Sequence, residues 1–168
     1  MISRRTVLKA LALLPGVGAL RALGETEGPE RWRPLVSAAA YRVLFEEATE
    51  RPYSSPLNDE KRQGIYHCAA CYAPLFASEA KYDSGTGWPS FTQALPEAMG
   101  TKRDFKLIVP RTEYHCARCG GHQGHVFNDG PRPTGQRWCN NGLALRFVPE
   151  GETAPALRWP ESAQAAPG

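Results

Sequence analysis

The sequence contains no apolar run long enough to cross a lipid bilayer as a helix, which takes about 20 residues. Its most continuous apolar stretch, residues 10–20, is shorter and is interrupted by Pro15, Gly16 and Gly18. The chain also has no internal repeat beyond two C-x-x-C motifs. The sequence therefore predicts neither a membrane-spanning helix nor a repeat architecture.

An excess of charge of one sign is also missing from most of the chain. The formal net charge of +3 arises in residues 1–24, which hold four basic residues and no acid. The remainder holds 16 basic against 17 acidic side chains, a net charge of −1. A near-neutral domain lacks the basic surface that binds a phosphate backbone, so we expect no nucleic-acid partner.

Residues 1–24 have the organisation of an export signal. A twin-arginine stretch, SRRTVLK at 3–9, precedes the apolar stretch, and Ala22-Leu23-Gly24 offers small residues for cleavage. Twin-arginine signals of bacteria have this pattern. We therefore expect export to the periplasm or another extracytoplasmic compartment. The alternative is an N-terminal helix of a cytosolic protein.

Glycine and proline are abundant, at 16 and 15 residues, and favour strands and turns over a helical bundle. Residues 25–33 are polar and predict a linker. Apolar residues at 36, 40, 43 and 44 then recur with helical spacing, which predicts an amphipathic helix of about three turns. From residue 64 onward, short apolar runs between turn signals predict strands: GIYHC, PLF, DSGTGWPSF, FKLIVP, TEYHC, GHVF and LALRFV.

These elements predict one mainly β (α+β) domain over residues 34–150. We expect two small antiparallel β-sheets, helices near the N-terminus, and a structural zinc site that joins two C-x-x-C turns. Residues 151–168 predict a flexible tail. We expect the domain to be a monomer.

Four of the five cysteines form two C-x-x-C motifs, CAAC and CARC, separated by 44 residues. Each motif places two sulfurs on one side of a tight turn. Two such turns together supply four thiolates, which zinc binds in closed structural sites at about 2.3 Å per sulfur. Such a site contributes on the order of 10 kcal/mol to folding. We predict one structural Zn²⁺ ion, bound by Cys68, Cys71, Cys116 and Cys119.

Two other interpretations of these four cysteines stay open at this point. An exported protein meets an oxidising compartment, where the sulfurs can form two disulfides. One motif could instead be a thioredoxin-like redox pair, although no βαβ pattern surrounds either motif.

The fifth cysteine, Cys139, stands alone between aromatic and polar neighbours in the segment RWCNN. A lone cysteine is often a small buried apolar residue. Here Arg137 offers a positive charge, and Asn140 and Asn141 offer amide hydrogen bonds. A thiol pKa of about 8.5 falls beside cations or aligned donors. The setting therefore favours a nucleophilic thiolate.

Histidine and tryptophan side chains complete this candidate site. His122 and His125 lie three residues apart in the glycine-rich segment GGHQGHVFNDG. Two imidazoles near one cysteine suit nucleophilic catalysis with proton delivery; a second metal pair or two surface histidines are the alternatives. Trp88, on a glycine turn, offers an apolar wall and an N–H donor, or else belongs to the core.

Long segments of the chain resemble the methionine sulfoxide reductase B family. They are CAACYAPLFASEAKYDSGTGWPSF, RTEYHCARCGGHQGHVFNDGPRPTG and QRWCNNGLALRFVP. The upstream segment YRVLFEEATERPYSSPLNDEKRQGIYHC is similar to the same family. The resemblance covers roughly residues 32–149, in order and without large gaps.

This resemblance implies reduction of the R-epimer of methionine sulfoxide in proteins, and so the repair of oxidised proteins, on a fold of two antiparallel sheets. It implies that the four paired cysteines are the structural zinc ligands. It implies that Cys139 is the catalytic cysteine, assisted by His122 and His125. The substrate pocket implied by the same match includes Trp88, Asn141 and Arg137, with the methionine methyl group against Trp88.

The implied chemistry has two stages. The Cys139 thiolate attacks the partially positive sulfoxide sulfur, and the two histidines supply protons or hydrogen bonds to the basic oxygen, one of them through water. Methionine leaves, and Cys139 keeps the oxygen as sulfenic acid. Many relatives then use a second cysteine where this chain has Thr86. We therefore expect an external reductant, a thioredoxin-like protein or a small thiol.

A second departure from the family pattern is Gly142-Leu143, where relatives usually carry Ser and Ala. This difference bears on substrate preference rather than on the class of reaction. Two non-enzymatic alternatives remain: a zinc module that binds a protein partner and uses Cys139 only as filler, and a zinc-ribbon nucleic-acid binder. The near-neutral charge and the export signal weigh against the second.

Overall fold

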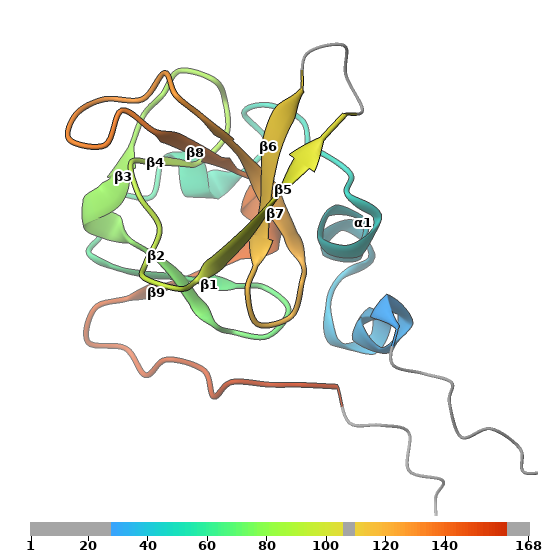
Figure 1. The fold of residues 1–168 in the computed structure, drawn as a ribbon. Coiled ribbons are helices and arrows are strands. Elements are labelled where there is room, and N and C mark those ends of the chain that lie inside the picture. The colour runs from blue at the N-terminus through green and yellow to red at the C-terminus, as the bar shows by residue number, and fades with distance from the viewer. Residues whose placement is uncertain (1–27, 106–109, 161–168) are drawn as a thin grey trace, which may run out of the picture.

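The computed structural model describes residues 28–105 and 110–160, and within these ranges nine strands form two antiparallel sheets (Figure 1). The three-stranded sheet has the order β2 (Pro74–Ala77), β1 (Gly64–Cys68) and β9 (Leu145–Pro149). The six-stranded sheet has the order β3 (Lys81–Tyr82), β4 (Ser90–Phe91), β8 (Arg137–Asn140), β7 (His122–Phe127), β6 (Arg111–Cys116) and β5 (Met99–Asp104). The predicted fold class is confirmed.

Aromatic side chains fill the space between the two sheets. Phe76 from the small sheet stacks on Phe91 from the large sheet, with ring centroids 4.1 Å apart. Tyr66 meets Phe91 edge-on at 5.0 Å, and Tyr114 meets Trp138 edge-on at 4.8 Å. Because side chains alternate between the faces of a strand, this packing leaves the opposite face of the large sheet for the polar residues described below.

The predicted N-terminal helix is present as α1, Ala38–Glu46, with helix η1, Pro29–Leu35, before it. Ser37 caps α1, since its hydroxyl accepts a hydrogen bond from the Ala40 amide at 3.1 Å. The helix ends at Glu47 in the left-handed conformation. The buried face of α1 consists of Ala40, Tyr41, Val43 and Leu44. Short 3₁₀ turns occur at η2 (Pro56–Asn58), η3 (Ser78–Ala80) and η4 (Gly142–Ala144).

The predicted linker at 25–33 differs from the structure, because η1 begins within it. Trp32 is 2% exposed and stacks on Phe45 at 5.7 Å, and it also meets Trp159 edge-on at 5.3 Å. Burial of one large aromatic ring is enough to fix an otherwise polar segment against the domain.

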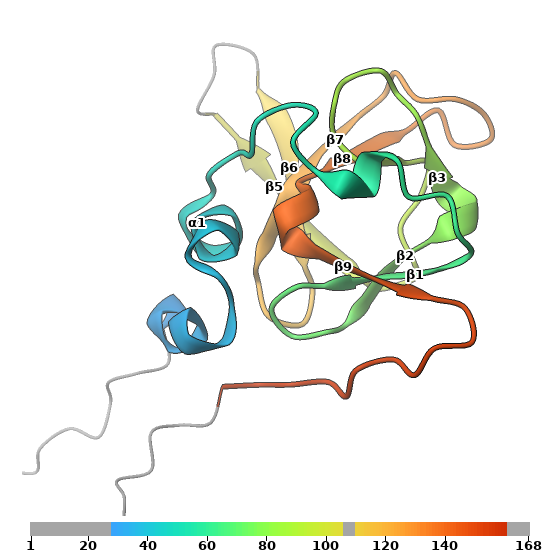
Figure 2. The same ribbon diagram turned by 180° about the vertical axis from the view of Figure 1, so that it is seen from behind.

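The segment predicted as a flexible tail also contacts the domain. Residues 151–160 form no helix or strand. They run back along the small sheet toward η1 (Figure 2), where Arg158 donates to the carbonyls of Ala69 and Ala70.

One predicted strand falls largely outside the described residues. The run FKLIVP at 105–110 predicts a strand, but the edge strand β5 is the preceding, more polar segment Met99–Asp104, and Phe105 is 72% exposed. Most of that run, residues 106–109, lies outside the described residues, as does the predicted signal at 1–24. Among the helices that the structure describes, none has the length and hydropathy needed to cross a bilayer.

Candidate active site and metal centre

The pairing of β7 with β8 places His125 opposite Cys139 and Phe127 opposite Arg137. On the other side of β8, Ser90 of β4 is the partner of Cys139. Directly opposed residues of an antiparallel pair project from the same face of the sheet. The register therefore brings together a cysteine, a histidine, an arginine and a serine from three strands.

A cavity of about 300 Å³ opens over this part of the sheet. It is lined by five of the six side chains predicted for catalysis or substrate binding: Cys139, His125, Trp88, Asn141 and Arg137. The sixth, His122, is 3% exposed and borders a neighbouring cavity that His125 also lines. Its ring centroid lies 5.5 Å from that of His125.

Cys139 is half-buried, and burial raises the pKa of its thiol. A hydrogen bond from Thr86, whose Oγ1 lies 3.8 Å from the Sγ atom, acts in the opposite direction, as do Arg137 and Ser90. The expected lowering of the thiol pKa is therefore wrong for the cavity without substrate. Loss of water around the sulfur outweighs the nearby donors.

Arg137 is engaged by an acidic partner, which explains its modest effect on Cys139. Its Nε and Nη2 atoms donate to the two carboxylate oxygens of Asp129 at 2.9 and 2.8 Å. Its guanidinium also lies over the Phe127 ring, 4.2 Å from the centroid. The arginine is thus held in place at the cavity wall, with its charge largely balanced by Asp129.

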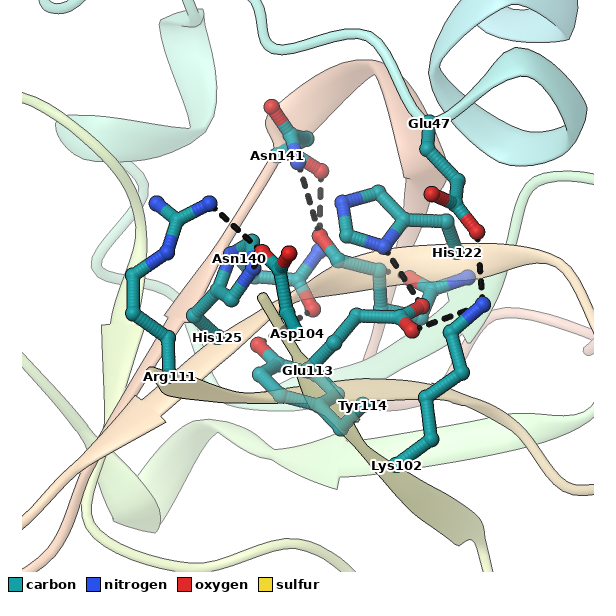
Figure 3. Close-up of polar contacts among 11 residues, drawn as sticks. Glu47, Lys102, Asp104, Arg111, Glu113, Tyr114, His122, His125, Asn140 and Asn141 are labelled. Atoms are coloured by element: carbon teal, nitrogen blue, oxygen red, sulfur yellow. Dashed lines mark hydrogen bonds and ion pairs between the residues drawn. The ribbon is translucent and has the colours of Figure 1, made fainter. Parts of the chain in front are cut away.

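His125 is hydrogen-bonded to a carboxylate that is also paired with an arginine (Figure 3). Its Nε2 atom lies 2.7 Å from Oδ2 of Asp104, to which Arg111 Nη2 also donates at 2.6 Å. Burial lowers the pKa of His125, and the hydrogen bond to Asp104 partly offsets this effect. Since Nε2 faces Asp104, Nδ1 is the ring nitrogen that can serve the cavity.

His122 takes part in a parallel arrangement, visible in Figure 3. Its Nδ1 atom lies 2.7 Å from Oε1 of Glu113, which is 3% exposed. Lys102 bridges Glu113, at 3.0 Å, and Glu47, at 2.6 Å. Each histidine therefore has its own carboxylate, and each of these carboxylates has its own cation.

Trp88 and Asn141 are fixed through the same residue, Glu50. The Trp88 indole N–H donates to the Glu50 carbonyl at 3.1 Å, and the Glu50 amide donates to Asn141 Oδ1 at 3.0 Å. The Asn141 amide group also donates to the Gln123 carbonyl at 3.0 Å. The indole N–H, expected as a donor to the cavity, is therefore used within the protein.

The four paired cysteines form the metal centre that their spacing predicts. Their sulfur atoms all lie within 4.8 Å of one another, and the sulfurs of Cys68 and Cys119, and of Cys71 and Cys116, are 3.6 Å apart. Sulfurs at about 2.3 Å from a tetrahedral zinc are roughly 3.8 Å apart, whereas bonded sulfurs are about 2.05 Å apart. The four sulfurs therefore fit a metal ion rather than two disulfides.

Two left-handed residues shape the turns that hold these sulfurs. Tyr72 follows the first pair with φ 63°, and Gly120 follows the second with φ 74°. The first motif extends β1 of the small sheet and the second extends β6 of the large sheet. The metal centre therefore joins the two C-x-x-C turns, as predicted, and through them the two sheets.

The family model described as the SelR domain matches residues 36–149. The chain belongs to the SelR domain family.

Several relatives in this family carry the name peptide methionine sulfoxide reductase MsrB. The protein of Leifsonia xyli subsp. xyli is 50% identical over 73% of this chain and 90% of its own length. Those of Pseudomonas entomophila and Bradyrhizobium diazoefficiens are 50% and 51% identical, over 71% and 72% of this chain and 92% and 88% of their own lengths. Among solved structures, the Mis18 'Yippee-like' domain covers 54% of this chain and 100% of its own, with a TM-score of 0.42 and 18% identity.

The SelR domain of this chain uses several residues that sequence reasoning missed. Asp104 and Glu113 hold the two histidines, and Glu50 holds Trp88 and Asn141. Gln123 links the two centres, since its Nε2 lies 3.6 Å from Cys68 Sγ and its carbonyl accepts from Asn141. The alternation of side chains between the two faces of the strand TEYHC could have indicated that Glu113 lies on the same face as the site. No local pattern in the sequence indicates Glu50 or Asp104.

Proposed function

We propose that this protein is a peptide-methionine (R)-S-oxide reductase, which reduces methionine-R-sulfoxide in proteins to methionine. Membership of the SelR domain family supports the class of reaction. The observation that carries the residue assignment is the register that sets His125 opposite Cys139 in a cavity shared with Trp88 and Asn141.

Cys139 is the nucleophile, and His125 moves the proton. Before substrate binds, the raised pKa of the thiol and the lowered pKa of the imidazole keep both groups neutral. Nδ1 of His125 takes the thiol proton as Sγ attacks the sulfoxide sulfur, and the imidazolium then protonates the sulfoxide oxygen. Asp104, bonded to Nε2, stabilises the imidazolium.

The products of this step balance. The oxygen atom passes from methionine to Cys139, so the methionine sulfur is reduced by two electrons and Cys139 is oxidised to sulfenic acid. Trp88 supplies an apolar wall for the methyl group, and Asn141 and Arg137 bound the polar side of the cavity. His122, whose ring centroid lies 5.5 Å from that of His125, is held by its own pair with Glu113 and acts to lower the pKa of His125.

An external thiol regenerates the enzyme. It attacks the sulfenic acid with release of water, and a second thiol then frees Cys139 as a disulfide of the reductant leaves. Four cysteines belong to the metal centre, and Thr86 lies beside Cys139 without a thiol. Thiol counting after oxidation by a sulfoxide tests this step: we expect no internal disulfide in the wild type and one to Cys139 in the Thr86→Cys variant.

The metal centre holds one structural zinc ion. Four convergent thiolates without an acidic or imidazole ligand are the donor set that structural zinc prefers. The ion supplies cross-linking of the two sheets and takes no part in the redox step. Metal analysis of the purified protein tests this assignment, with one zinc per chain as the expected result.

Export and assembly are the remaining parts of the proposal. The twin-arginine pattern at 3–9 supports export of the folded, metal-loaded domain out of the cytoplasm, and we expect a monomer there. Replacement of Arg4 and Arg5 by lysine should leave the precursor in the cytoplasm. Light scattering of the mature protein should give the mass of one chain.

The reductase assignment is tested with a peptide that carries either sulfoxide epimer, together with several thiol donors. We expect turnover of the R-epimer only, and none in Cys139→Ser. A zinc module that only binds a partner would show no turnover in either protein, and the substitution would leave partner binding unchanged.

A further inference from the structure

We propose that Glu50 is a positioning residue for this reaction: it holds Trp88, Asn141 and the turn at 142–143 in one arrangement around the substrate. The inference rests on the proposed function. Glu50 lies in the irregular segment between α1 and η2, far in sequence from each residue that it holds.

The main chain of Glu50 lies between two residues of the cavity. Its carbonyl accepts the hydrogen bond of the Trp88 indole at 3.1 Å, and its amide donates to the side chain of Asn141 at 3.0 Å. The direction of the indole plane and the orientation of the Asn141 amide therefore both depend on where the backbone of residue 50 lies.

The carboxylate of Glu50 fixes that backbone. It accepts hydrogen bonds from the backbone amides of Gly142 and Leu143, the latter at 3.0 Å. These amides open the 3₁₀ turn that follows Asn141, where the first N–H groups lack partners within the turn. The side chain thus ties residue 50 to the segment that carries Cys139 and Asn141.

The two segments approach each other closely at Gly142. A Cβ atom there would lie 1.9 Å from Ser55 Oγ and 3.2 Å from Glu50 Oε1. The glycine that departs from the usual family pattern is therefore the residue that lets Glu50 and Ser55 reach the turn.

Glu50 is 8% exposed, and its burial raises the pKa of the carboxyl while the two backbone amides act in the opposite direction. A carboxylate in such a place is costly unless its hydrogen bonds are met. Both oxygens accept hydrogen bonds from the turn, and Glu50 is not among the residues that line the cavity of Cys139. Glu50 is thus a support for the cavity and not a proton donor.

The test compares Glu50→Gln and Glu50→Ala with the wild type on the R-sulfoxide peptide. Glutamine keeps one acceptor but turns an NH₂ group toward the second amide, so we expect its KM to rise about tenfold, equivalent to about 1.4 kcal/mol. Alanine should raise KM further. The value of kcat should fall by much less, and the rate of alkylation of Cys139 by iodoacetamide should stay near that of the wild type.

Leu75→Ala, which truncates a fully buried core residue in β2, is the control for a loss of stability without a loss of positioning. We expect it to lower the melting temperature at least as much as Glu50→Gln without changing KM. If KM is unchanged in both Glu50 variants, or rises equally in Leu75→Ala, the positioning role is wrong.

A measurement that needs no turnover separates this inference from the proposed function. The emission of Trp88, taken as the difference between proteins with and without Trp88→Phe, should shift to the red in Glu50→Gln as water reaches the indole N–H. An unchanged Trp88 emission would overturn the role of Glu50 even if the enzyme reduces sulfoxides. If the Trp88 emission shifts but the protein does not reduce sulfoxides, the role of Glu50 in holding Trp88 is supported and only the proposed reaction is refuted.

Discussion

The five cysteines belong to two regions that differ in how the chain builds them. At the metal centre, two turns each supply two sulfurs, and all four lie within 4.8 Å of one another. At the second region, Cys139 is the single sulfur, and its neighbours come from separate elements: Thr86 from a loop, Ser90 from β4 and His125 from β7.

The surroundings differ as well. The sulfurs of the metal centre accept hydrogen bonds from the Cys119 backbone amide and the Gln123 side chain. The neighbourhood of Cys139 is lined with groups that can exchange protons, and each histidine has a carboxylate partner. Four convergent sulfurs suit a structural metal ion that cross-links the chain, whereas one sulfur beside a carboxylate-bound imidazole suits nucleophilic catalysis.

The largest effect should come from breaking the metal centre. In Cys71→Ser one ligand of the set is lost, and binding of a structural zinc ion is worth on the order of 10 kcal/mol. We expect the variant to fail to fold, and a chelator to unfold the wild type. Circular dichroism with metal analysis checks this. Cys139→Ser is the matched control, and we expect it to fold. Equal stability of the two variants would contradict the distinction between a structural metal centre and a reactive Cys139.

The next effect concerns the proton carrier. His125→Asn should lower kcat about 10²- to 10⁴-fold, the usual contribution of a positioned acid–base group. The melting temperature should change little. His122→Asn is the comparison, and we expect a smaller loss because His122 borders the neighbouring cavity. A larger loss in His122→Asn would reverse the roles of the two rings.

The dependence of kcat/KM on pH tests the same assignment of His125 as the proton carrier. The log of kcat/KM should rise with pH through the lowered pKa of His125, below about 6.5, and fall through the raised pKa of Cys139, above about 8.5. Asp104 raises the pKa of His125, so Asp104→Asn should move the acid limb to lower pH and lower the plateau. The exposed Glu79→Gln is the control; an acid limb that moves upward would contradict the assignment.

The free energy of unfolding should depend on pH through the same titration of His125. Because the folded pKa of His125 lies below its unfolded value, the unfolded chain binds more protons between the two. This group therefore makes the protein more stable as pH rises through that window, and the contribution is lost on acidification.

The smallest effect concerns the C-terminal segment. Arg158 Nη2 donates to the Ala69 carbonyl at 2.8 Å, and its guanidinium lies over the Tyr72 ring, 4.0 Å from the centroid. Arg158→Ala should lower the free energy of unfolding by about 1–3 kcal/mol, since buried carbonyls lose a charged donor. It should also speed metal loss to a chelator without changing kcat. Arg103→Ala, an exposed arginine of β5, should do neither.

Local patterns in the sequence predicted local structure well. GIYHC and TEYHC are strands, the apolar spacing before residue 46 is a helix, and each C-x-x-C pair is a turn that presents two sulfurs. The alternation of short apolar runs with turn residues also predicted a mainly β domain of two antiparallel sheets.

The remaining features depend on contacts that no local pattern encodes. The polar strand β5 is an edge strand whose pairing with β6 sets it in place, and η1 is fixed by Trp32 against Phe45 and Trp159. The thiol pKa of Cys139 depends on how much water the fold removes, which outweighs the charge of Arg137. Glu50 and Asp104 reach the site only through tertiary packing.

The central claim is that Cys139 accepts the oxygen of methionine sulfoxide while the four metal-bound cysteines do not react. Metal-loaded protein should be mixed with an R-sulfoxide peptide in the absence of any thiol and treated with a reagent that traps sulfenic acids. We expect about one methionine per chain, with the trapped oxygen on Cys139 alone. No methionine, or oxidation confined to the metal-centre cysteines, would contradict the account.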